Sequence, residues 1–181
     1  MRTVTSGTPS AALPVSMLTA TLIGFGLGGF MIAMKAGTAG ALRYPLFVGF
    51  ALLLAMAFLS LSALIAALCQ RKNRAFGVVM FLWFFFVLFY DLLVIGGTFF
   101  FREHTANQFI FASLFGNPVD MTRVGSLILL NGKEIFGVAG AALTRFLGGD
   151  VASILLLVLG LTFWIVAPFL LSQRLLKRQD I

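Results

Sequence analysis

Charged residues are scarce in this sequence, and their scarcity excludes a surface that faces water. Only 10% of the 181 residues are Asp, Glu, Lys or Arg, whereas 60% are apolar. Soluble domains carry about 25% charged residues, so this chain cannot cover a soluble fold with polar side chains. The composition therefore predicts an integral membrane protein.

Cysteine and histidine are almost absent. Cys69 is the only cysteine and His104 the only histidine, so no disulfide can form within the chain. These two side chains are predicted on opposite sides of the membrane, and Met31 and Met34 alone are more typical of core filling than of a copper(I) site. No predicted span holds paired carboxylates or a nucleophile with a base. We predict no catalytic, cofactor-binding or metal-binding residue.

Four apolar runs are long enough to cross a bilayer, which takes about 20 helical residues. These predicted spans cover residues 11–34, 44–69, 75–101 and 151–172. A Gly/Ala-rich turn at residues 35–43 and a polar turn at residues 70–74 separate the first three. We predict one transmembrane domain, residues 1–181, that is all-α and has about four transmembrane helices. A glycine pair in the first span, Gly24 and Gly28, is spaced for close helix packing.

The long connection at residues 102–150 is predicted to hold interfacial or re-entrant helices. A fifth span at 124–146 would bury several polar side chains, and each charge near the bilayer centre costs about 2.5–3.5 kcal/mol. These side chains are Asn131, Lys133, Glu134 and Arg145. Two apolar faces at helical spacing favour shorter helices instead. They consist of Phe109, Ile110, Leu114 and Phe115, and of Ile135, Val138, Ala142 and Phe146.

The basic residues predict the orientation of the chain. With four spans, both termini share one side with the short basic segment Arg71–Arg74. Because short basic segments mark the cytoplasmic side, we predict cytoplasmic termini and an extracytoplasmic 102–150 connection. The same rule explains the net charge of +7, so the partner surface is the lipid bilayer and not nucleic acid.

Asp91 is the one acidic residue within the third predicted span. A straight helix from Arg74 would carry it about 25 Å, into the outer half of the bilayer. A carboxylate there needs water or a partner. It could belong to a transport pathway, or it could form a structural ion pair with Arg123 or Arg102.

A compact polar segment, Asn117-Pro118-Val119-Asp120-Met121-Thr122-Arg123, predicts a turn that enters a helix. Asn117 can form an Asx-turn, Pro118 suits the first helical position, and Asp120 complements the positive end of a helix. Arg123 follows Asp120 by three residues, which is close enough for an ion pair. A capped helix start explains this pattern without a binding site.

The run from Phe81 to Leu93, with its acid at Asp91, and the motif Asn117-Pro118-x-Asp120-x-x-Arg123 resemble a known family. They are similar to the NosY-like permeases of the ABC transporter for nitrous-oxide-reductase maturation, within the type-two ABC exporter permeases. The resemblance is strongest over residues 60–131. It places the four predicted spans on the last four of the family's six helices, so the first two helices and their coupling segment have no counterpart. The chain would be half of a split permease or a truncated one.

This resemblance implies a bacterial or archaeal inner-membrane permease that supports copper-site assembly in the reductase. The expected partners are an ABC ATPase subunit, which binds the ATP, a second permease copy or an N-terminal permease half, and a periplasmic protein. The residues that match the family motifs are Asp91, Asn117, Pro118, Asp120 and Arg123. The alternative function is a non-transporting membrane scaffold that anchors a larger complex. A proton-coupled carrier that uses Asp91 is a third hypothesis, which the single buried acid disfavours.

Overall fold

The computed structural model describes residues 9–69, 72–100, 103–129 and 148–179, and every regular element within these ranges is a helix. The all-α prediction is confirmed. The second predicted face of the 102–150 connection, Ile135 to Phe146, lies outside the described residues, as do Arg71, Arg102 and the polar side chains from Asn131 to Arg145 that argue against a fifth span. The elements are α1 (Pro9–Leu68), α2 (Lys72–Phe84), the π-helix η1 (Phe85–Phe89), α3 (Tyr90–Thr98), α4 (Glu103–Ser113), the 3₁₀-helix η2 (Leu114–Gly116), α5 (Pro118–Leu129) and α7 (Asp150–Gln179).

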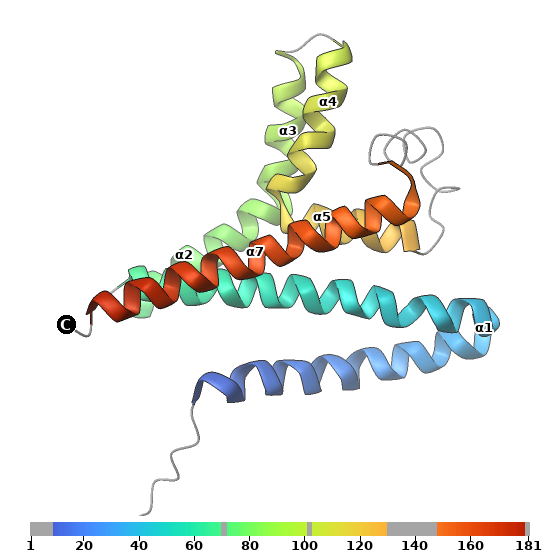
Figure 1. Cartoon of the computed structure of the whole chain (residues 1–181), viewed down its shortest axis with the longest axis horizontal. Helices are drawn as coiled ribbons and strands as arrows, with labels where there is room; N and C mark the ends of the chain where they lie inside the picture. Colours follow the sequence, from blue (N-terminus) through green and yellow to red (C-terminus); the bar gives the residue numbers. More distant parts are fainter. Residues whose placement is uncertain (1–8, 70–71, 101–102, 130–147, 180–181) are drawn as a thin grey trace, which may run out of the picture.

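Helix α1 contains the first two predicted spans and turns back on itself between them. Figure 1 shows its blue first half and its cyan second half lying antiparallel. The Tyr44 hydroxyl donates a hydrogen bond of 2.6 Å to the carbonyl of Phe25, 19 residues earlier, whereas a straight helix would separate the two by about 28 Å. The predicted reversal is therefore present, but residues 35–43 are helical and not an open turn.

Two glycines allow the Tyr44 ring to lie against the first half of α1. A Cβ atom on Gly28 would lie 3.0 Å from the Tyr44 hydroxyl oxygen, and one on Gly29 would lie 2.7 Å from its Cδ1. The predicted packing pair was Gly24 with Gly28, yet a Cβ on Gly24 would have no neighbour within 4 Å. The residues that allow close packing are therefore Gly28 and Gly29, which face Tyr44 in the second half of α1.

Three helical stretches of the described chain are long and apolar enough to cross a membrane. They are Arg43–Leu68, Asn73–Thr98 and Asp150–Lys177, and they correspond to the second, third and fourth predicted spans. The first predicted span, residues 11–34, is helical along its length within α1.

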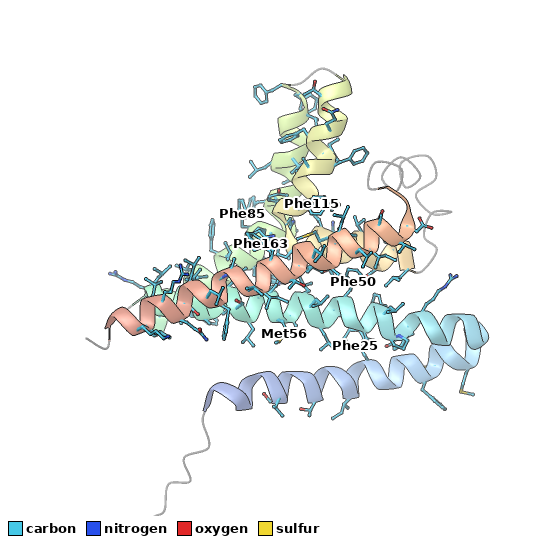
Figure 2. The ribbon with its side chains drawn as sticks, viewed as in Figure 1. Phe25, Phe50, Met56, Phe85, Phe115 and Phe163 are labelled. Atoms are coloured by element: carbon cyan, nitrogen blue, oxygen red, sulfur yellow. The ribbon has the colours of Figure 1, made fainter. Side chains whose placement is uncertain are left out.

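The buried core lies where α1, α5, α7 and η2 meet. Its buried members are Phe50, Leu114, Met121, Ile128, Leu129, Leu157 and Leu161. Figure 2 shows Phe50 on the side of α1 that faces α5 and α7. The Ser60 hydroxyl also donates a 2.6 Å hydrogen bond to the Ile165 carbonyl, which ties α1 directly to α7. This core fixes the base on which α5 rests.

Gly125 allows α5 to approach α1, and its replacement by alanine is expected to destabilise the fold. A Cβ atom there would lie 2.6 Å from Cζ of Phe50, whose ring is only 4% exposed. Overpacking of this kind costs about 1–3 kcal/mol. Thermal unfolding in detergent should show the lower melting temperature. The matched control is Gly49→Ala on α1, where a Cβ meets nothing within 4 Å; an equal loss in both variants would contradict the packing argument.

The third predicted span is bent, which the prediction of a continuous helix over 75–101 missed. Helix α2 runs along the bundle, and at η1 the chain turns away into α3 (Figure 1). Helices α3 (residues 90–98) and α4 (residues 103–113) pack against each other as a helical hairpin, and η2 then leads into α5. Figure 1 shows α2 and α5 along opposite halves of α7, with this hairpin leaving the bundle between them. Asp91 therefore lies just past the bend, and its depth does not follow from a straight helix that starts at Arg74.

Candidate functional site

The π-helix η1 changes which backbone groups are paired at the bend. The Tyr90 N–H donates to the carbonyl of Phe85, five residues back, whereas an α-helix would direct it to Phe86. The Phe86 carbonyl instead accepts a 2.8 Å hydrogen bond from Nδ2 of Asn117. Short π segments inside α-helices occur frequently at functional sites, and here the segment provides an acceptor for a side chain 31 residues away.

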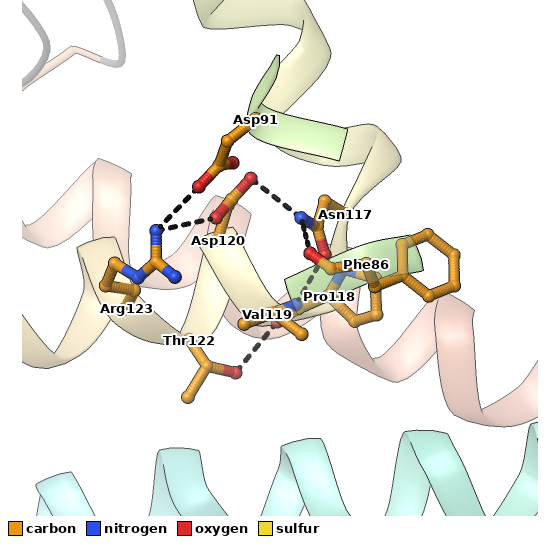
Figure 3. Close-up of polar contacts among 8 residues, drawn as sticks. All are labelled: Phe86, Asp91, Asn117, Pro118, Val119, Asp120, Thr122 and Arg123. Carbon is orange, nitrogen blue, oxygen red and sulfur yellow. Dashed lines mark hydrogen bonds and ion pairs between the residues drawn. The ribbon is translucent and has the colours of Figure 1, made fainter. Parts of the chain in front are cut away.

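Asn117 connects this π segment to the start of α5 (Figure 3). Its Nδ2 also donates to Oδ2 of Asp120 at 2.8 Å, and its Oδ1 accepts from the Val119 N–H at 3.0 Å. The last bond is the N-cap that the sequence predicts, with Pro118 in the first helical position. Because Asn117 is fully buried, its two donated bonds and one accepted bond take the place of hydrogen bonds to water.

An ion cluster connects the beginning of α3 to α5. Nη1 of Arg123 lies 3.1 Å from Oδ2 of Asp91 and 3.3 Å from Oδ1 of Asp120. The predicted Asp91–Arg123 and Asp120–Arg123 pairs are therefore both present, while the other candidate, Arg102, lies outside the described residues. The Asp120 side chain is 16% exposed, against 38% for Asp91 and 51% for Arg123. The carboxylate on α5 is thus the better shielded of the two.

Asp120 lies outside the three stretches of membrane-spanning length. Burial raises the pKa of its carboxyl group to about 6, and the hydrogen bond and negative charge of Asp91 act in the same direction. Arg123 and Asn117 oppose this rise, because they favour the charged form of Asp120. Two acids that share one guanidinium therefore compete for it.

Two aromatic side chains bind carbonyls at the end of α4 and in η2. The Tyr90 hydroxyl donates to the Ser113 carbonyl at 2.7 Å, and Nε1 of Trp164 donates to the Phe115 carbonyl at 3.1 Å. The last carbonyls of a helix lack partners within that helix, so these bonds satisfy groups that η2 would otherwise expose. Sequence reasoning missed both residues. The available signal is that buried Tyr and Trp side chains usually find a hydrogen-bond partner.

Phe86 holds the bend from its apolar side. Its ring is 6% exposed, and its centroid lies 5.5 Å from that of Trp164 on α7 and 6.3 Å from that of Phe58 on α1. Both pairs are close to edge-to-face, which is a favoured arrangement of aromatic rings. The Phe86 carbonyl and ring are thus fixed by different elements of the bundle.

The ion cluster faces a groove of about 300 Å³. The groove is lined by Asp91, Val94, Ile95, Ile110, Ser113, Leu114, Asp120, Arg123 and Val124. Both carboxylates already contact Arg123, and within the described ranges no three His, Cys, Asp or Glu side chains are grouped to hold a metal ion. The chemistry of the cluster is therefore charge pairing at a bend, with no arranged nucleophile or acid–base pair. The ion cluster and the adjoining N-cap of α5 together contain all five predicted site residues, and their functional role stays a prediction.

Comparison with known proteins places these features in a family. The profile described as "ABC-2 family transporter protein" matches residues 10–181. The chain is 33% identical over 167 residues to a protein of Pseudomonas aeruginosa strain PAO1 described as "Probable ABC transporter permease protein NosY". That alignment covers 90% of this chain and 58% of the relative, so the chain spans little more than half of that relative's length.

Proposed function

Since the chain belongs to the ABC-2 family of transporter proteins, we propose that it forms the membrane-embedded permease part of an ABC transporter. The family match over residues 10–181 carries this proposal. The chain is a multi-pass membrane protein, and its three apolar helices of spanning length suit a permease. The family implies an ABC ATPase partner. In this proposal that separate subunit binds and hydrolyses ATP, and the present chain has no enzymatic activity of its own.

The proposed orientation puts both termini in the cytoplasm of a bacterial or archaeal cell, with the protein in the inner membrane. Exposed basic side chains support it: Arg74 near the start of α2, and Arg174 and Lys177 near the end of α7. Figure 1 shows these two helix ends at the same end of the bundle, and positive charge marks the cytoplasmic side. The proposed assembly also contains a second permease copy or an N-terminal permease half, and a periplasmic partner. A NosY-like part in nitrous-oxide-reductase maturation is the specific role that we propose for it.

Within this permease, we assign Asp91, Asn117, Pro118, Asp120 and Arg123 to the joint between the third span and α5. Asn117 and Pro118 begin α5 where η1 ends the straight part of the span. The three charged groups link the two sides of that joint. The assignment makes them positioning residues that set the path of the helices, and it requires no direct contact with the transported substrate.

The test is to purify the native complex gently from membranes and to identify its subunits by intact-mass spectrometry. We expect a nucleotide-binding ATPase to accompany the chain and the complex to hydrolyse ATP, because a permease of this family works with such a subunit. A complex that lacks any ATPase after mild extraction would overturn the proposal. That outcome would leave the membrane scaffold as the better explanation of the chain.

A further inference from the structure

The hairpin formed by α3 and α4 begins and ends in irregular helix. The chain enters it through the π-helix η1 and leaves it through the 3₁₀-helix η2. Figure 2 shows Phe85, from η1, and Phe115, from η2, close to where the hairpin leaves the bundle. Short π segments are frequent at functional sites, and 3₁₀ stretches often serve as connectors or hinges; here one of each lies at the base of one structural unit.

The two helices of the hairpin contact each other directly. A Cβ atom on Gly97 of α3 would lie 2.9 Å from Cε1 of Phe109 on α4, so the missing side chain allows the two helices to approach closely. Among the described residues, the two helices contact chiefly each other and the two irregular segments at their base, and such a unit can move as a rigid body.

The polar contacts at the base have two different roles. The Tyr90 hydroxyl donates to the Ser113 carbonyl, and the Asn117 amide donates to the Phe86 carbonyl. Both bonds lie at the base, and they would persist if the hairpin rotated about it. The Asp91–Arg123 ion pair joins the first turn of α3 to the second turn of α5, so it sets the angle between them. Among the described residues it is the ion pair that connects the hairpin to α5.

Arg123 can release Asp91 without losing all of its ionic partners. Its Nη1 also contacts Asp120 on its own helix, three residues earlier, and that contact does not depend on the position of the hairpin. The exposed fractions of Arg123 and Asp91, 51% and 38%, are those of an accessible pair next to the groove. Because Arg123 keeps Asp120 as a partner, its ion pair with Asp91 is suited to reversible breaking. The hydrogen bonds of the fully buried Asn117 are not.

We propose that the α3–α4 hairpin is hinged at η1 and η2, and that the Asp91–Arg123 ion pair holds it in the position seen here. When the pair opens, Arg123 stays bound to Asp120 and the hairpin swings away from α5. The inference concerns the movement of this chain and does not depend on an ATPase partner, so it and the permease proposal can fail separately.

The experiment measures spin-label distances in the native complex, reconstituted in lipid. Ile95→Cys on α3 and Leu159→Cys on α7 provide the labels, since these residues are 58% and 64% exposed, in a Cys69→Ser background. The parent should give one narrow distance. Asp91→Asn should add a second distance or broaden the distribution, and Asp91→Glu, which keeps the charge, should restore the narrow one.

A second label pair tests whether the bundle itself survives. Leu46→Cys on α1, 56% exposed, with Leu159→Cys should give the same distance in the parent and in Asp91→Asn. If the hairpin distance is unchanged in Asp91→Asn, or is already broad in the parent, the ion pair does not hold the hairpin and the proposal is overturned. If the α1–α7 distance broadens as well, the variant loosens the whole fold, and the proposal fails for that reason.

Discussion

Replacement of Asn117 by alanine is expected to lower the melting temperature of the detergent-solubilised protein by roughly 5–15 °C. The variant removes the N-cap of α5, which is worth about 0.5–2 kcal/mol. It also leaves the Phe86 carbonyl without the side-chain donor that binds it at 2.8 Å, and an unpaired buried acceptor costs about 1–3 kcal/mol. Asn117 is fully buried, so water cannot replace it without repacking. Thermal unfolding followed by tryptophan fluorescence would measure the loss.

Asn117→Asp separates the two roles of this side chain. An aspartate keeps the oxygen that accepts the Val119 N–H and remains a good N-cap. It cannot donate to the Phe86 carbonyl, and it adds a carboxylate beside Asp120. We therefore expect it to be at least as unstable as Asn117→Ala, and a near-native Asn117→Asp protein would show that the N-cap is the whole effect. Gln173→Ala, which removes an exposed amide from α7, is the control and should leave the melting temperature unchanged.

The local features of the site could be predicted because short-range rules determine them. The Asn117 cap, the position of Pro118 and the Asp120–Arg123 pair all lie within seven consecutive residues. The first two follow from helix-capping geometry, and the third from the three-residue spacing on one helix face. The Asp91–Arg123 pair spans 32 residues. Arg123 was one of the two partners predicted for Asp91, because an acid in an apolar span needs a cation. The cost of an unpaired acid in an apolar span therefore indicated the Asp91–Arg123 contact, although the two residues lie far apart in the sequence.

The bend could not be predicted because the third apolar run has no periodic signal. Residues 85–89 are Phe-Phe-Val-Leu-Phe, without the Gly or Pro that usually causes a kink. A segment that is apolar on all sides does not indicate where a π turn will occur. Tertiary contacts stabilise the bend instead, through the Phe86 ring against Trp164 and the Phe86 carbonyl against Asn117. These partners lie on elements that only the fold brings together.

Arg123→Gln should destabilise the protein far more than Asp91→Asn, although both variants break the same ion pair. Without Arg123, the carboxylates of Asp91 and Asp120 lose their shared cation, and for Asp91, which lies in the stretch Asn73–Thr98, an unpaired charge costs up to about 2.5–3.5 kcal/mol on insertion scales. Without the Asp91 charge, Arg123 still contacts Asp120 at 3.3 Å, and loss of a partly exposed pair costs about 0–1 kcal/mol. Unfolding free energies from denaturant titration in mixed micelles would compare the two variants.

The double variant Arg123→Gln/Asp91→Asn gives the sharper result. It removes one of the two carboxylates that Arg123→Gln leaves without a cation. It should therefore be more stable than Arg123→Gln alone, so the second substitution acts as a partial rescue. If the substitutions only removed an attraction, the double variant would be no more stable than the less stable of the two single variants. Non-additivity of this sign is expected when loss of the guanidinium leaves a carboxylate without its cation, and Arg123 Nη1 contacts both acids, at 3.1 Å and 3.3 Å. Equal losses in the two single variants would mean that Asp120 does not compete for Arg123.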